Sequence, residues 1–91
     1  MPYDSFIKQR IPLDVRNSDR LAFGFLRSIV KQNAIRTTQQ LENYVITEVD
    51  SYRRWLAKNR TSPTMNRLRR ETVQKLTYLL KVKGLVDAHL K

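Results

Sequence analysis

Apolar residues recur at three- and four-residue steps in three stretches of the chain, and this spacing is typical of amphipathic α-helices. The first stretch predicts a helix over residues 18–33. Asn17 or Ser18 is expected to cap its start, with Asp19 in the first turn, where a negative charge suits the helix dipole. The expected buried stripe consists of Ala22, Phe25, Leu26, Ile29 and Val30.

The second stretch predicts a helix from Thr37 to about Asn59. Thr37 and Gln40 have the spacing of a capping box, in which two side chains satisfy free N–H groups at a helix start. The β-branched run at 45–47 lowers helix propensity, so two shorter helices are an alternative to one long helix. Trp55 is expected to be a core residue. The expected buried face consists of Leu41, Val45, Val49, Tyr52 and Leu56.

The third stretch predicts a helix over residues 63–83. Ser62 is expected to cap it, and Pro63 suits the first helical position, where its missing N–H costs nothing. Gly84 is expected to end the helix, after lysines in the last turn that suit the dipole. The apolar stripe consists of Met65, Leu68, Thr72 or Val73, Leu76, and Leu79 or Leu80. The opposite, polar side carries Asn66, Arg67, Arg70, Gln74 and Lys81.

Residues 1–17 are expected to form an extended arm. Pro2 and Pro12 each disfavour a helical conformation in the residue before them, and the apolar residues between them are irregularly spaced. A frayed terminus is the alternative. The predicted fold is therefore all-α: a single domain over 18–91, built as a small bundle of three to four helices, with an extended N-terminal arm.

Net charge is the strongest bulk property of the chain. Its 91 residues include 18 lysines and arginines against 8 acidic residues, which gives a formal net charge of +10. A field of this sign attracts polyanions, and a basic footprint is the first indication of a nucleic-acid-binding protein. An acidic protein partner is the alternative that charge alone leaves open.

Several kinds of chemistry are disfavoured by composition. The chain has no cysteine, one histidine and two glycines, so we expect no metal site, no glycine-rich phosphate loop and no Ser-His-Asp triad. We therefore expect a non-enzyme without a cofactor. No apolar run approaches the roughly 20 residues that span a bilayer, so we expect no membrane partner and a cytoplasmic or nucleoid-associated location.

The polar side of the third helix carries side chains that suit contacts to duplex DNA. Arginine pairs with guanine edges and asparagine or glutamine with adenine, so Asn66, Arg67, Arg70 and Gln74 are candidate contacts. Lys81, on the same polar side, is a further candidate. Small hydroxyl groups at a helix start suit phosphates. Thr61, Ser62 and Thr64 are the candidates for that role. The alternative is an ordinary solvated face, with Glu71 and Asp50 pairing with some of the arginines.

Four segments of the chain follow a known family pattern. They are residues 37–45 (TTQQLENYV), 52–59 (YRRWLAKN), 61–70 (TSPTMNRLRR) and 79–87 (LLKVKGLVD). On these segments the chain resembles the core-binding, SAM-like helical domain of tyrosine recombinases and phage integrases. It departs at the start of the third helix, where Ser62 is followed by Thr64 rather than by a threonine three residues on.

The resemblance implies a small helical bundle that clamps duplex DNA, with the helix matching 62–83 against the DNA. It adds Arg60 to the candidate contacts. The chain ends at Lys91, where the family's catalytic domain begins, so we expect DNA binding without recombination chemistry. A catalytic recombinase or another protein is then an expected second partner.

Two other resemblances and two other functions stay open as alternatives. Residues 48–69 are also similar to the start of the helical dimerisation domain of glutamyl-tRNA reductases, without its long continuing helix. Residues 72–86 are similar to a winged-helix recognition helix, without a hairpin after it. By function, the alternatives to DNA binding are a basic protein-interaction module, such as a mobile-element or phage protein docking on an acidic partner, and an RNA-binding component of a ribonucleoprotein.

Overall fold

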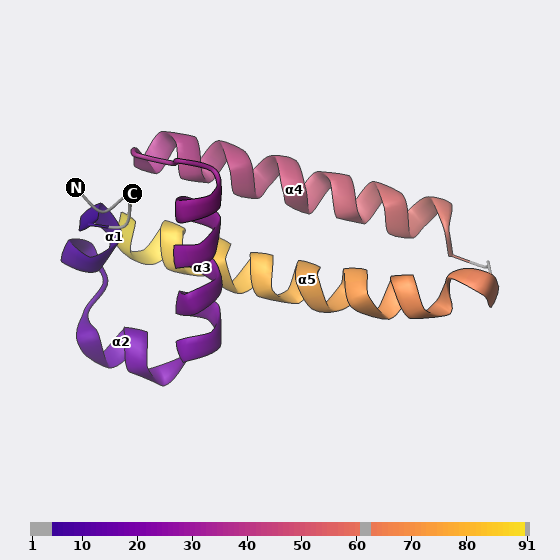
Figure 1. Cartoon of the computed structure of the whole chain (residues 1–91), viewed down its shortest axis with the longest axis horizontal. Helices are drawn as coiled ribbons and strands as arrows, with labels where there is room; N and C mark the ends of the chain where they lie inside the picture. The colour runs from indigo at the N-terminus through magenta and orange to yellow at the C-terminus, as the bar shows by residue number, and fades with distance from the viewer. Residues whose placement is uncertain (1–4, 61–62, 91) are drawn as a thin grey trace.

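A computed structural model of the chain describes residues 5–60 and 63–90, and every regular element in that part is helical (Figure 1). The elements in chain order are α1 (Ser5–Arg10), α2 (Leu13–Ser18), α3 (Arg20–Gln32), α4 (Thr38–Lys58), the 3₁₀ turn η1 (Pro63–Met65), α5 (Asn66–Leu85) and the π-helical turn η2 (Val86–Leu90). The predicted all-α class and small helical bundle are confirmed.

The N-terminal segment is helical rather than extended over its described residues. Pro12 separates two short helices, because it ends α1 and takes the N-cap position of α2 with φ −59°. Ile7 and Ile11 are fully buried, and their spacing of four residues places them on one side of α1. The Arg10 Nη1 donates a hydrogen bond of 2.9 Å to the Leu90 carbonyl oxygen. The predicted extended arm is therefore wrong, because burial of these isoleucines against the C-terminal turn stabilises the helical form.

Helix α3 begins two residues later than predicted. Asn17 and Ser18 belong to α2, and Asp19 is the N-cap, with its Oδ1 accepting a 3.1 Å hydrogen bond from the Ala22 N–H. The helix ends at Gln32 with Asn33 as its C-cap, and the next residue, Ala34, has φ 50°. This left-handed residue lets the Ile35 N–H reach the Val30 carbonyl oxygen at 3.0 Å, which is the hydrogen-bond pattern of a Schellman motif.

Helix α4 is one continuous helix. Half of its predicted capping box is present, since the Thr37 Oγ1 accepts from the Gln40 N–H at 3.2 Å. The Gln40 Oε1 accepts at 2.9 Å from the Arg36 N–H, one residue before the Thr37 cap whose N–H a capping box uses. Val45 and Val49 are buried, so tertiary packing outweighs the low propensity of the β-branched run. The alternative of two shorter helices is therefore wrong.

The predicted stop at Gly84 is also wrong. α5 continues to Leu85, and the π-helical turn η2 follows it directly. No described glycine has a positive φ, so Gly84 does not form the left-handed cap. Val86 and Leu90 are buried in the core, and their packing holds the chain in a helical course beyond the glycine.

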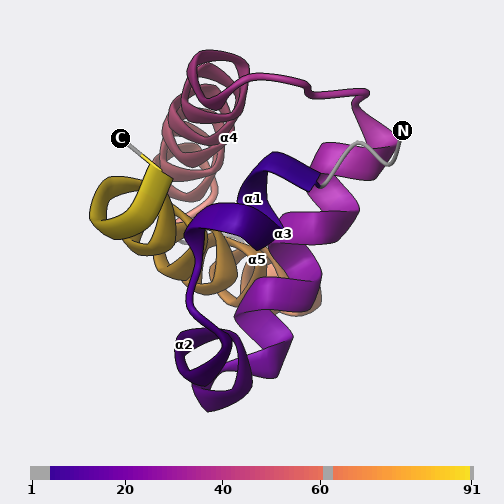
Figure 2. The same cartoon turned by 90° about the vertical axis from the view of Figure 1, so that its left-hand side faces the viewer.

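The core occupies one end of the antiparallel hairpin formed by α4 and α5. The buried residues of α4 are Leu41, Val45 and Val49, in its first half, and those of α5 are Leu79 and Val82, in its second half. α1, α2 and α3 surround this end, which we call the base (Figure 2). The other half of the hairpin, here called the outer end, extends beyond α3 (Figure 1). Trp55 and Leu56, expected in the core, lie in the outer end and are only half-buried.

Candidate nucleic-acid interface

Positive charge is concentrated at the outer end of the hairpin. Residues 50–75 contain eight lysines and arginines and two acidic residues, and so carry six of the ten net positive charges of the chain. They comprise the end of α4, the connection and the start of α5 (Figure 1). Because these charges lie together on a projecting hairpin, the positive potential that attracts a polyanion is concentrated at this end of the molecule.

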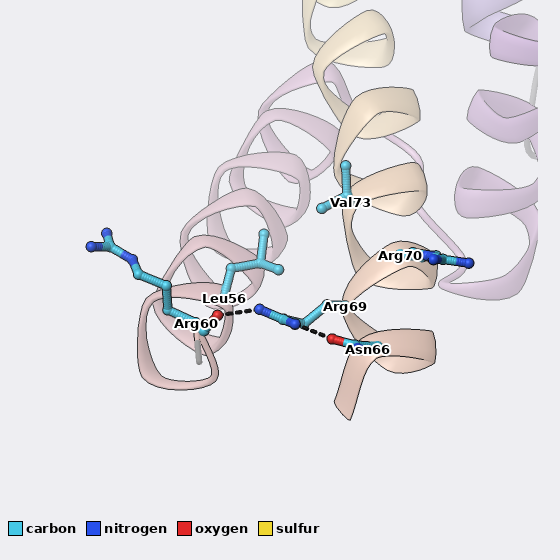
Figure 3. Close-up of a pocket in the computed structure, with 6 residues that line it drawn as sticks. All are labelled: Leu56, Arg60, Asn66, Arg69, Arg70 and Val73. Atoms are coloured by element: carbon cyan, nitrogen blue, oxygen red, sulfur yellow. Dashed lines mark hydrogen bonds between the residues drawn. The ribbon is translucent and has the colours of Figure 1, made fainter. Parts of the chain in front are cut away.

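The exposed face of α5 at this end holds four of the predicted contact residues. Asn66, Arg70 and Gln74 recur at four-residue steps and therefore lie on one side of the helix. Arg67 lies one step around the helix from Asn66, and all four side chains are exposed. Figure 3 shows the Arg70 side chain pointing away from α4. The structure therefore brings these four residues together on a surface that a ligand can reach.

The two acidic residues of the outer end pair with arginines, as the alternative of a solvated charged face foresaw. The Arg67 Nε lies 3.4 Å from the Glu71 Oε1, and the Arg54 Nη2 lies 2.5 Å from the Asp50 Oδ2. The Arg67 side chain is 92% exposed. Exposed pairs of this kind contribute at most about 1 kcal/mol, so Arg67 can exchange Glu71 for a phosphate at little cost.

The structure separates Lys81 from the other candidates. It lies seven residues beyond Gln74, about 10 Å further along the helix axis. Its Nζ is 3.5 Å from the Asp19 Oδ2 and 5.6 Å from the centre of the Tyr78 ring. Lys81 therefore joins α5 to the start of α3 at the base, although its position on the helical wheel predicted a place in the contact set.

Two of the remaining candidates, Arg60 and Thr64, lie at the turn of the hairpin. Thr64 is exposed in η1, and Arg60 is exposed just beyond the Asn59 cap of α4. Thr61 and Ser62, including the predicted cap at Ser62, lie outside the described residues. α5 proper begins at Asn66, so the predicted helix start at Pro63 corresponds to the 3₁₀ turn η1.

Arg69 makes a structural contact that the sequence did not reveal. Its Nη1 donates a hydrogen bond to the Arg60 carbonyl oxygen and its Nη2 donates to the Asn66 Oδ1 (Figure 3). The side chain thus bridges from α5 to the end of α4 and is half-buried. Arg69 therefore holds the two helices of the hairpin together and positions Asn66, while its neighbour Arg70 faces solvent.

A hollow of about 680 Å³ opens between the two helices beside Arg69. It is lined by Leu56, Arg60, Asn66, Arg69, Arg70 and Val73 (Figure 3). Its walls combine apolar surface from both helices with the Arg69 guanidinium, whereas the side chains of Arg60 and Arg70 extend away from it on opposite sides (Figure 3). A second hollow, of about 430 Å³, lies on α4 around Arg53 and Arg54 and extends to Lys83.

The described residues form neither a metal-binding cluster nor a membrane-spanning helix. Histidine, aspartate and glutamate side chains in this part of the chain form no group of three that could hold a metal ion. Among the helices described, none combines the length and the apolar character needed to cross a membrane.

Comparison of the chain with models of protein families, with curated proteins and with solved structures finds no match in any of the three. The resemblance to the core-binding domain of tyrosine recombinases therefore stays a prediction, and function has to be argued from the geometry of the outer end.

Proposed function

We propose that this chain binds duplex DNA, mainly through its phosphates, with the outer end of the α4–α5 hairpin. The observation that carries the proposal is the exposed face formed by Asn66, Arg67, Arg70 and Gln74, set within a segment that holds six net positive charges. Guanidinium groups bind phosphate oxygens with directed, charge-assisted hydrogen bonds, and the neighbouring amides can reach base edges.

The packing of the hairpin limits how it can meet DNA. Packed helices lie about 8–10 Å apart and each is about 10–12 Å wide, whereas the major groove is about 12 Å wide. Both helices cannot enter the groove side by side, so α5 would approach with the face that is turned away from α4. Arg60 and Thr64, at the turn, would then lie near the flanking phosphates. Most contacts would be to the backbone, which positions a protein without strong sequence preference.

The proposed role is to hold DNA, without a chemical step of its own. The resemblance to core-binding domains of tyrosine recombinases agrees with this role, because the helix that matches 62–83 in that family lies against DNA. A catalytic partner would supply any cutting or joining of strands.

Binding of a labelled DNA duplex, measured by fluorescence anisotropy at several salt concentrations, tests the proposal. Each phosphate neutralised should add about −0.9 to the slope of log affinity against log salt. Arg67→Ala combined with Arg70→Ala should weaken binding and make the slope less steep by about 1.8. The matched control is Arg20→Ala combined with Lys31→Ala, which removes two exposed charges from α3 at the base and should change the slope much less.

Three outcomes would overturn the proposal. Binding without a salt slope would contradict phosphate contacts, and equal losses in the two double variants would show that only total charge matters. Tighter binding to duplex RNA or to single-stranded DNA, measured in parallel, would assign the surface to a different nucleic acid.

A further inference from the structure

The outer end and the adjoining part of α5 expose apolar surface that phosphate binding does not explain. Val73 is 50% exposed and Leu80, seven residues further along α5, is 40% exposed. Leu56 on α4 is half-buried and lines the same hollow as Val73. Among the described residues, α4 has no fully buried side chain after Val49 and α5 has none before Leu79. Folding therefore leaves this apolar surface exposed to solvent. Phosphate groups are fully polar, so binding them would not bury it.

The charges around the hollow restrict what can occupy it. Three of its six lining residues are arginines and none is acidic (Figure 3). A second copy of the chain would bring the same positive outer end, and like charges facing each other are unfavourable. An occupant that carries carboxylates beside apolar side chains would satisfy the arginines and the exposed valine and leucines together.

We propose that this hollow binds an acidic amphipathic helix of a partner protein. One apolar side chain of that helix would lie between Leu56 and Val73, and carboxylates beside it would pair with Arg60 and Arg70. A volume of about 680 Å³ is within the range of about 300–1,000 Å³ that is usual for binding pockets. Amphipathic helices commonly bind such grooves through apolar residues at i, i+3 or i+4, and i+7.

The spacing on α5 agrees with this mode of binding. Val73 and Leu80 are seven residues apart and lie on nearly the same side of α5, about 10 Å apart along its axis. A peptide helix lying along α5 would present its own i and i+7 side chains at the same spacing. Both exposed apolar residues of α5 would then be covered by one helix.

The inference goes beyond the proposed DNA binding and uses an adjacent, partly overlapping side of α5. The two surfaces share Asn66 and Arg70, whereas Arg67 and Gln74 do not line the hollow and Leu56 and Val73 do not belong to the DNA-contact set. Variants can therefore separate the two activities. Sharing Arg70 also means that a bound acidic helix would compete with DNA for the same guanidinium.

The probe is a synthetic peptide of about 18 residues, or five helical turns, with leucines along one face and glutamates elsewhere. One control peptide has the same composition with its leucines distributed around the helix, and a second has glutamine in place of glutamate. The full chain should bind the designed peptide at least about tenfold more tightly than either control. Equal binding of the redistributed peptide would show that charge alone acts, which would overturn the proposal without depending on any variant.

Two variants of the chain locate the site. Val73→Gln removes the apolar wall without changing charge, at a position where half the side chain already meets solvent, and should abolish peptide binding while DNA binding persists. Arg67→Ala should weaken DNA binding and leave peptide binding intact. Unchanged peptide affinity in Val73→Gln would overturn the inference. The inference would also be overturned if the parent chain self-associates in sedimentation experiments and Val73→Gln does not, because a second copy would then be the occupant.

Discussion

Arg69 and Arg70 are adjacent arginines with opposite surroundings, and replacing each by alanine separates structure from binding. Arg69 is half-buried and donates to the Arg60 carbonyl oxygen and the Asn66 Oδ1. Arg70 is exposed and points away from α4 (Figure 3). We expect Arg69→Ala to loosen the outer end of the hairpin, and Arg70→Ala to weaken DNA binding while the hairpin keeps its stability.

The size of the Arg69 effect follows from the bonds it loses. Each intramolecular hydrogen bond contributes about 0.5–1.5 kcal/mol net, and partial exposure places the two bonds of Arg69 toward the lower part of that range. We therefore expect a loss of about 1–2 kcal/mol. The loss should be local, because the buried residues of α4 and α5 all lie in the base and hold it independently of the outer end.

Amide hydrogen exchange measured by mass spectrometry resolves this local effect. A loss of 1–2 kcal/mol corresponds to a roughly 5–30-fold increase in the open population. In Arg69→Ala, amides of residues 53–58 and 66–72 should exchange faster by about this factor, while those of residues 26–30 stay protected. In Arg70→Ala both regions should exchange as in the parent chain. Equal effects of the two substitutions, or a uniform increase over the whole chain, would refute the assignment of Arg69 as the bridge.

Three further predictions concern the stability of the fold. Ala34→Gly should raise the free energy of unfolding in urea by about 0.5–1 kcal/mol, since glycine adopts a positive φ without the strain of a Cβ but gains freedom in the unfolded chain; lower stability would contradict the left-handed cap. Leu79→Ala should cost about 2–5 kcal/mol because Leu79 is 2% exposed, whereas Leu68→Ala should cost about 1 kcal/mol or less because Leu68 is 48% exposed; equal losses would contradict this division. Burial, together with a nearby glutamate, raises the pKa of Tyr44 and of Tyr52. Because these tyrosines ionise at lower pH in the unfolded chain than in the folded one, their contribution to the free energy of unfolding is fully present below pH 10 and should be lost above it. Tyrosinate absorbance and circular dichroism, measured together during a pH titration, check this order.

The features that sequence predicted correctly depend on neighbouring residues. The Thr37 cap on the Gln40 N–H is formed within one helical turn, and the buried stripe of α4 at Leu41, Val45 and Val49 follows from helical spacing alone. The wrong predictions, the extended arm and the helix stop at Gly84, concern features that depend on contacts between residues far apart in the sequence. Pro12 interrupts the chain as expected, but burial of distant residues decides that the flanking segments are helical, and the same burial carries the helical course past Gly84.

The candidate site divides in the same way. Helical spacing correctly placed Asn66, Arg70 and Gln74 on an exposed side of α5. It also grouped Lys81 with them, because a helical wheel shows the direction of a side chain but not where along the helix another element packs. The hollow beside Arg69 depends on how α4 and α5 are rotated against each other, and no local pattern in either helix fixes that rotation.

The separation of base and outer end explains how one small chain can present a charged surface without a core beneath it. α4 and α5 each pass without interruption from the base into the outer end, so burial at the base anchors both helices. Intrahelical hydrogen bonds and the Arg69 bridge then keep both helices folded in the outer end. A ligand that binds the outer end would neutralise mutually repelling arginines and cover the exposed valine and leucines. Binding of either proposed ligand should therefore slow amide exchange most in the outer end, and uniform protection of base and outer end would contradict this division of the molecule.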